Sequence, residues 1–364
     1  MSVAYMPLGI SDPKTLYIIG NGFDLHHGIP SFYGNFATFI KRVDPDTYSV
    51  IEKYFDVDNK FWGEFETRLA DFDADFAIDD ASQFLMPYGA EDWSDSGHHD
   101  YQYELDRIVQ SLSKTLQIRF SEWVRGLQIP IQADYRGAKI PMDEGATYLT
   151  FNYTDTLQSL YGIDEQQILH LHGRASCTKQ KLILGHGWQQ KDEDRLSFRI
   201  DPIEADTRYW EGLQIVDSYF SATFKPTKDV IALCQPFFQS LGSIVRILVM
   251  GHSFAEVDLP YFHEIIKNID STKVHWKISY YENLSSIQEN FLALGIDESL
   301  ASFAKLSEID HWKPLPFDMN ETDFPIQSST HRCLIGRSGV KMGLLKSHLS
   351  SRKGEVHDNR NSRH

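Results

Sequence analysis

The sequence predicts an α/β protein built on a parallel sheet with large helical insertions. Short, nearly continuous apolar runs recur along the chain, and each is followed by a turn or a helix signal. Parallel strands that helices cover on both faces have this pattern. The chain has 364 residues, of which 41% are apolar and 24% charged, so it is long enough for two domains, or for one domain with insertions, around a substantial core.

The apolar runs place the strands. We expect strands at residues 16–19, 146–151, 167–171, 182–184, 245–250 and 274–280. A helix with Leu157 and Leu160 on its apolar face follows the second run and ends at Gly162, and a helix with Leu259, Phe262 and Ile265 follows the fifth.

Two long stretches, 31–142 and 190–242, have the apolar spacing of amphipathic helices. We therefore expect one α/β domain over 13–325 with these stretches as insertions. The first insertion carries an acidic block, 56–106, with fifteen acidic residues against two basic ones, which we interpret as a solvated face. Residues 326–364 form a basic tail, for which we expect flexibility rather than docking.

Charge and composition exclude several classes of protein. The net charge of −16 disfavours bulk attraction to a nucleic-acid backbone or to an anionic membrane, so we expect neither as a partner. No apolar run is long enough to span a membrane, and the N-terminus lacks the pattern of a signal peptide. The three cysteines are scattered, which excludes a disulfide framework or structural zinc as a first expectation. We expect a cytoplasmic protein.

Polar or glycine residues follow four of the predicted strands. They are Gly20-Asn21-Gly22, Asn152, His172-Gly173 and Gly251-His252-Ser253. Ligands of an open parallel sheet bind beyond the carboxyl ends of its strands, and glycine lets a ligand approach the backbone closely. The sequence therefore predicts a ligand site at this edge of the sheet.

The segment at the first of these turns resembles a known family. GNGFDLHHGIPSFY, residues 20–33, has the spacing of the first NAD-binding loop of sirtuins, GAG-x-S-x-x-SGIP-x-FR. FNYTDTL at 151–157 is similar to the TNYD-x-L segment of sirtuin-like domains in bacterial defence proteins. LHLHG at 169–173 looks like their catalytic His-Gly, and GHSFAEVD at 251–258 like their adenosine-side loop.

A narrower resemblance adds the segment 61–70, FWGEFETRLA. Together with the motifs above, it looks like the bacteriophage abortive-infection AbiH family, and the motifs lie between residues 16 and 280. The resemblance implies a sirtuin-like, Rossmann-like fold that acts in anti-phage defence. It implies NAD⁺ as substrate or ligand and cleavage of the bond between nicotinamide and ribose.

The resemblance also implies roles for individual residues. His172 would be the general base, and Asn152 would orient the ribose and the attacking water. The remaining candidates would contact the dinucleotide: the backbone amides of Gly20, Asn21 and Gly22 at the pyrophosphate, Gly251 and Ser253 at the adenosine half, and Gly28, Asp24 and Asp155 elsewhere along the loop and helix starts.

The chain departs from the sirtuin pattern at several positions. Asn21 replaces an alanine, Asp24 and His27 replace two serines, and Tyr33 replaces an arginine. Thr154 takes the place of the acid that contacts nicotinamide, so that acid is displaced to Asp155, replaced by Asp24, or absent. The zinc ribbon of deacylating sirtuins is missing, so we do not expect protein deacylation.

Each candidate residue also has a purely structural interpretation. His170 or His172 could be a hydrogen-bonded histidine at a strand end, and motif position favours His172 as the catalytic one. Asn152 could cap the following helix, and Asp24 could complement a helix dipole. Trp62 and Phe65, at helical spacing, fit a core better than a stacking platform.

Two other classes of function remain open at this stage. The chain could be a silent sensor that binds NAD or an ADP-ribose derivative and gates a partner, or a metal-dependent nuclease. Histidines are possible metal ligands, and six of the fifteen lie in or near the motifs: His26, His27, His170, His172, His186 and His252. They show no ligand spacing such as HExxH, so we expect no metal. A second copy of the chain or a phage-derived trigger are further candidate partners.

Overall fold

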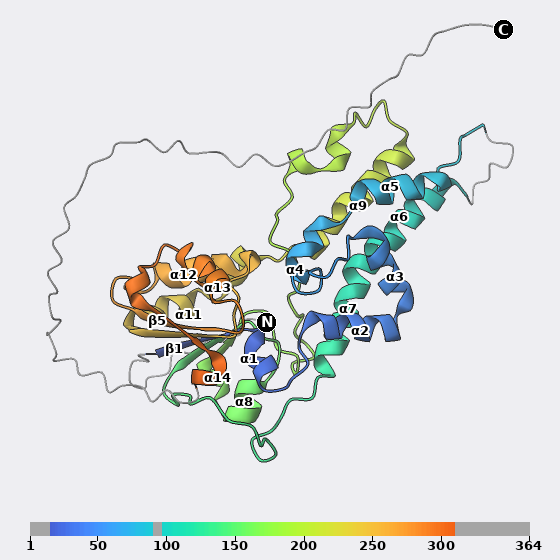
Figure 1. Ribbon diagram of the computed structural model, residues 1–364. Coiled ribbons are helices and arrows are strands. Elements are labelled where there is room, and N and C mark those ends of the chain that lie inside the picture. Colours follow the sequence, from blue (N-terminus) through green and yellow to red (C-terminus); the bar gives the residue numbers. More distant parts are fainter. Residues whose placement is uncertain (1–14, 90–96, 310–364) are drawn as a thin grey trace, which may run out of the picture. The chain divides into compact units, whose positions relative to one another are not determined.

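The computed structural model describes residues 15–89 and 97–309, all of which belong to one compact unit. Its sheet has six strands in the order β3-β2-β1-β4-β5-β6 (Figure 1), and every neighbouring pair is parallel. The strands are β1 (Thr15–Ile19), β2 (Thr147–Thr150), β3 (Ile168–His170), β4 (Arg246–Met250), β5 (His275–Tyr280) and β6 (Ala301–Lys305). This strand order is that of doubly wound, Rossmann-like folds, so the predicted fold class is confirmed.

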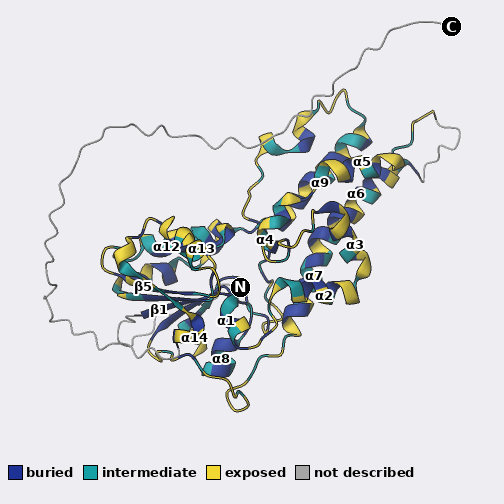
Figure 2. Cartoon of the chain, in the orientation of Figure 1, coloured by how far each residue is buried: buried dark blue, intermediate teal, exposed yellow. Residues whose placement is uncertain are grey.

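Helices cover both faces of the sheet. One layer contains α10 (Thr227–Leu233), α11 (Gln235–Gln239), α12 (Leu259–Lys267) and α13 (Leu284–Leu292), and the other α1 (Asn21–His26), α8 (Thr156–Tyr161) and α14 (Leu306–Ile309). Successive residues of a strand point to opposite faces. Leu16 and Ile18 of β1 accordingly pack with the first layer, and Tyr17 and Ile19 with the second. The central strands β1, β2 and β4 are therefore almost entirely buried, whereas the edge strand β6 has no buried residue (Figure 2).

A helical body is assembled from two segments that lie far apart in the sequence. The first supplies α2 (Tyr33–Val43), α3 (Pro45–Tyr54), α4 (Phe65–Arg68), α5 (Ala74–Ala81), α6 (Asp100–Gln110) and α7 (Leu116–Arg125), and the second supplies α9 (Thr207–Thr223). A π-helical turn at Ser111–Thr115 joins α6 to α7. Helix α9 packs along α6, so this part of the second predicted insertion joins the first in one body.

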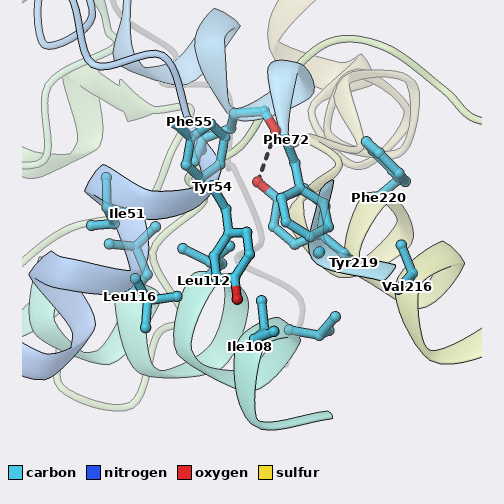
Figure 3. Close-up of a cluster of buried hydrophobic side chains, with 14 of the residues drawn as sticks. Ile51, Tyr54, Phe55, Phe72, Ile108, Leu112, Leu116, Val216, Tyr219 and Phe220 are labelled. Atoms are coloured by element: carbon cyan, nitrogen blue, oxygen red, sulfur yellow. Dashed lines mark hydrogen bonds between the residues drawn. The ribbon is translucent and has the colours of Figure 1, made fainter. Parts of the chain in front are cut away.

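Large apolar side chains fill the core of this body. Figure 3 shows residues of α3, α6 and α7 meeting Val216, Tyr219 and Phe220 of α9. The hydroxyl of the buried Tyr219 donates a hydrogen bond of 2.8 Å to the carbonyl of Leu69. Without this bond the buried hydroxyl would have no hydrogen-bond partner. Phe65 is buried in this core and Trp62 packs against it, as their helical spacing predicts.

The structure departs from the sequence prediction in three places. Residues 182–184 form no strand; Leu182 and Leu184 instead pack into the core of the helical body. Strand β6 was not predicted, because its sequence ASFAK has no continuous apolar run. Of the stretch 190–242, only the part up to α9 joins the helical body, while α10 and α11 lie on the sheet.

The acidic block runs through α4, α5 and α6, and part of it, 90–96, lies outside the described residues. Most of its described carboxylates are exposed, such as Asp56, Asp71 and Asp75, whereas Glu66 turns inward. The basic tail at 326–364 also lies outside the described residues. In the part of the chain that is described, no helix is long and apolar enough to cross a membrane.

Three glycines let the ends of β1 and β4 touch. Gly20 donates its N–H to the carbonyl of Met250 at 2.9 Å, and Gly22 donates to the carbonyl of Gly251 at 2.8 Å. Gly251 has φ of +70°, and a Cβ on it would lie 2.2 Å from the nitrogen of Phe23. A side chain cannot fit at these positions, because the backbone of the β1 turn packs directly against the backbone of the β4 turn.

We therefore expect Gly251→Ala to lower the free energy of unfolding by at least about 2 kcal/mol, since it adds a backbone clash to the cost of a left-handed conformation. Gly295→Ala is the matched control, because Gly295 has φ of +78° but a Cβ there meets nothing within 4 Å. Urea unfolding gives the loss of unfolding free energy for each variant. The difference between the two losses is the cost of the backbone clash, since both variants share the cost of the left-handed conformation. Equal losses in the two variants would show that the contact between the turns adds no stability.

Candidate functional site

The two glycine turns lie where the strand order reverses, between β1 and β4, which is where doubly wound sheets bind ligands. The N–H groups of Gly20 and Gly22 are already bonded to Met250 and Gly251. In this conformation the two glycines serve close packing of the turns, and binding of a pyrophosphate by their amides stays a prediction. The side-chain amide of Asn21 donates to the carbonyl of Ser31 at 3.0 Å and so ties the loop to its far end.

Asn152 links the end of β2 to the same loop. Its Nδ2 donates a hydrogen bond of 3.0 Å to the carbonyl of Gly20, and its own N–H bonds to the hydroxyl of Thr150 at 3.0 Å. The residue is buried. It does not cap α8, whose N-terminal cap position is Asp155. Asn152 therefore holds two adjacent strand ends in register at the floor of the site.

Asp24 is a buried carboxylate that accepts hydrogen bonds from the hydroxyl groups of two threonines. The Thr154 hydroxyl donates to Oδ2 at 2.6 Å and the Thr156 hydroxyl to Oδ1 at 2.7 Å. Burial raises the pKa of Asp24 to about 6, against the lowering effect of Thr154, Thr156 and Asn152. Thr154 stands where the family resemblance expects an acid, and the structure brings Asp24 against that same position.

His172 is buried directly after β3, and its ring hydrogen-bonds to the backbone carbonyl of Phe151. Its Nε2 has no hydrogen-bond partner, which favours the neutral tautomer with the proton on Nδ1. Burial, reinforced by the positive charge of Lys225, lowers the pKa of His172 to about 3. The ring is therefore neutral near pH 7 and carries an unshared electron pair on Nε2.

His170 behaves differently from His172. Its Nε2 contacts Nε2 of Gln158 at 2.9 Å, and its Nδ1 lies 3.3 Å from the carbonyl of Asn152. Both ring nitrogens of His170 therefore have partners, whereas Nε2 of His172 is buried and has none. His170 does not line the cavity described below.

A buried ion-pair network lies beside His172. Nζ of Lys225, which has no exposed surface, bonds to Oε2 of Glu66 at 2.7 Å and to Oδ1 of Asp258 at 2.9 Å. The Tyr33 hydroxyl donates to the other oxygen of Glu66 at 2.5 Å. The attraction of Lys225 holds the pKa of Asp258 far below its usual range, despite burial. Three charges are thus satisfied without solvent.

These groups surround a cavity of about 280 Å³. One wall consists of aromatic and aliphatic side chains of the helical body, among them Phe65, Phe120 and Trp123. The opposite wall contains the strand ends with Asn152 and His172. Carboxylates contribute to both walls, and none of the described residues that line the cavity is a lysine or an arginine. The cavity suits a ligand with a flat apolar part and positive charge.

The structure brings most of the sequence-predicted residues together. Those lining the cavity are Asn152, His172, Asn21, Gly22, Asp24, Gly251 and Ser253. Gly20 lies behind them in the glycine contact. Gly28 has φ of +76° in the turn after α1, and Asp155 forms an ion pair with Arg174 instead of facing the cavity.

Sequence reasoning missed the ion-pair network. Glu66 and Asp258 lay inside motifs that were recognised, FWGEFETRLA and GHSFAEVD, but their charges had no visible partner. Lys225 lies in the segment Phe224-Lys225-Pro226, where no neighbouring residue is an acid or belongs to a recognised motif. Its burial is a tertiary effect, and a lone lysine in a sequence is most often exposed.

No metal site emerges from residues 15–89 and 97–309, where no three His, Cys, Asp or Glu side chains are grouped to hold an ion. The many histidines are dispersed in different packing environments. His186, for example, is buried against Trp188 and Phe220, and burial lowers its pKa to about 4.

The sequence profile of the family described as "Bacteriophage abortive infection AbiH" matches residues 16–280. The chain therefore belongs to the AbiH family, and the family indicates a role in phage abortive infection. The matched region begins in β1 and ends with β5, so it includes every residue that lines the cavity. No curated protein matches the chain significantly.

The raised pKa of Asp24 predicts a pH-dependent stability. An acid with a folded pKa near 6 and an unfolded value of 3.8 binds more protons when folded, so its contribution to stability falls as pH rises through that interval. From pH 5 to pH 7 we therefore expect the free energy of unfolding of the wild type to fall by about 1 kcal/mol relative to that of Asp24→Asn.

Urea unfolding of both proteins across this range measures the difference. Asp75→Asn, which removes an exposed carboxylate, serves as the control and should keep the pH dependence of the wild type. If Asp24→Asn also keeps it, the carboxyl of Asp24 is not the group that titrates.

Proposed function

We propose that this AbiH-family chain hydrolyses NAD⁺ at the bond between nicotinamide and ribose, in the course of abortive infection. The observation that carries the proposal is the carboxylate-lined cavity at the strand-order switch, with the unshared pair of His172 Nε2 beside it. NAD⁺ carries its positive charge on the nicotinamide ring, and the reaction moves positive charge onto the ribose. Asp24, Glu64, Glu66 and Asp258 line the cavity, and Lys225 offsets one negative charge of the Glu66 and Asp258 pair. The excess of carboxylates favours both cations.

The bond changes follow from this charge distribution. The bond from ribose C1′ to the ring nitrogen breaks, and its electron pair neutralises the nicotinamide ring. The oxygen of a water molecule then bonds to C1′ of the oxocarbenium-like ribose and gives ADP-ribose. The water loses one proton to Nε2 of His172, which passes it to solvent. NAD⁺ and water thus yield nicotinamide, ADP-ribose and one proton.

The low pKa of His172, about 3, is compatible with this role. A water molecule that has begun to bond to an oxocarbenium carbon is a strong acid, so a weak base is sufficient to take its proton. The same burial keeps His172 unprotonated and ready at neutral pH. Aromatic side chains from the helical body, such as Phe120 and Trp123, offer apolar faces on which a planar nicotinamide can pack.

A second candidate, a nucleotide sensor without turnover, has one observation in its favour. The polar groups of Asn152 and Asp24 are already engaged with Gly20, Thr154 and Thr156. A site whose side chains satisfy one another can hold a ligand without activating water. The sensor would bind NAD⁺ or an ADP-ribose derivative and release no nicotinamide.

Nicotinamide release from NAD⁺ by the purified chain tests the proposal. We expect His172→Ala and Asn152→Ala each to lower the rate by at least about 100-fold, because each removes a group that acts on the reacting ribose or water. His263→Ala, which changes an exposed histidine on α12, is the matched control and should retain full activity. Circular dichroism establishes that all variants are folded.

Two outcomes would contradict the proposed hydrolysis. An active Asn152→Ala/His172→Ala double variant would exclude these residues as the machinery. Binding of NAD⁺ by calorimetry without any release, over a wide range of protein concentration, would favour the sensor instead.

A further inference from the structure

One oxygen of Asp258 faces two competing nitrogens. Oδ1 lies 2.9 Å from Nζ of Lys225 and 3.6 Å from Nε2 of His172. The first distance is a hydrogen bond, whereas the second is too long for one. The other oxygen, Oδ2, lies 3.4 Å from Nε2 of His252. The nearest carboxylate to His172 is therefore bonded to Lys225 instead.

Lys225 is fixed in this position from several sides. Its side chain is fully buried, and Glu66 of α4 holds Nζ from the side opposite to Asp258. Its backbone N–H donates to the carbonyl of His186 at 2.8 Å. If the ammonium group left, Glu66 and the buried Asp258 would both lose their cationic partner, so the ion pairs keep Lys225 bonded to Asp258.

We propose that Lys225 is a positioning residue that holds Asp258 away from His172 and thereby keeps Nε2 of His172 free to accept a proton. Without Lys225, His252 still faces Oδ2 of Asp258 at 3.4 Å, but Oδ1 loses its cationic partner and attracts a proton onto Nε2 of His172, which lies 3.6 Å away. The imidazolium would then persist, because buried opposite charges stabilise each other. A ring that keeps its proton on Nε2 cannot act as a base.

The other ionisable groups around His172 do not perform this function. Tyr153 and Tyr261 pack against its ring at centroid distances of 6.0 and 5.8 Å, and burial raises the pKa of both, so neither is charged near neutral pH. His252 shares Asp258 with Lys225, and its Nδ1 accepts the N–H of Phe254 at 2.9 Å. Among these neighbours, Lys225 is the buried group that carries a permanent positive charge.

The inference deepens the proposed hydrolysis and rests on it for its catalytic consequence, but the proton on His172 can be measured without substrate. The test compares the wild type with Lys225→Met/Glu66→Gln, which removes one positive and one negative charge together and leaves Asp258 facing His172. Lys53→Met/Asp80→Asn removes a partly exposed ion pair of the same 2.7 Å length and is the matched control. Histidine labelled with ¹³C at Cε1 reports protonation by NMR, and His172→Gln assigns the signal.

In the wild type and in the control, we expect the His172 signal to remain that of a neutral ring between about pH 5 and 8. In Lys225→Met/Glu66→Gln we expect its titration midpoint to rise by at least about two pH units from the wild-type value of about 3, so that protonation of His172 becomes visible within this range. A merely structural role for Lys225 does not predict this shift. A folded double variant with an unshifted midpoint would overturn the inference.

The wild type provides a second test that does not depend on the folding of a variant. Its ¹⁵N spectrum at pH 7 should show His172 with Nδ1 protonated and Nε2 bare. A proton on Nε2 would overturn the inference. Nicotinamide release is measured on the same samples: its absence from the wild type, with the expected His172 spectrum, contradicts the proposed hydrolysis and leaves the role of Lys225 in place.

Discussion

The buried ammonium group of Lys225 is the interaction on which the cavity depends. Burying one charge in a protein interior is costly unless opposite charges and hydrogen bonds surround it, and here Glu66 and Asp258 supply both. Glu66 comes from α4, Lys225 from the segment after α9, and Asp258 from the segment after β4. Because the three charges must meet, the helical body is held against the edge of the sheet, and the space between them becomes the cavity.

The parallel sheet determines where this cavity can form. Strand order reverses between β1 and β4, so the connections there leave in opposite directions and expose the strand ends. Gly20, Gly22 and Gly251 fill the gap with backbone alone, which brings the β1 and β4 turns together. Asn152 then ties β2 to the same point. These contacts give the site a closely packed floor.

Two buried carboxylates in this cavity have opposite environments. Lys225 keeps Asp258 ionised, whereas Asp24 has only hydroxyl and amide groups near it and a pKa of about 6. His172, 3.6 Å from Asp258, stays neutral because burial lowers its pKa to about 3. Neighbouring ionisable groups with pKa values that are driven apart are typical of sites that move protons. This contrast, rather than any single residue, is what makes the cavity a candidate for chemistry rather than packing alone.

The sequence by itself determined the fold class, five of the six strands and the edge of the sheet where the site lies, because apolar periodicity and strand-end residues are local features. It also singled out Asn152, His172 and Asp24, which stand in recognisable motifs. Only the tertiary structure decided that residues 182–184 leave the sheet, that α9 joins the helices of the first insertion, and that Lys225 lies buried between Glu66 and Asp258. Those outcomes depend on which segments, distant in the sequence, come into contact in the fold. The energy of a buried charge depends on its neighbours in space, and a local sequence pattern does not contain that information.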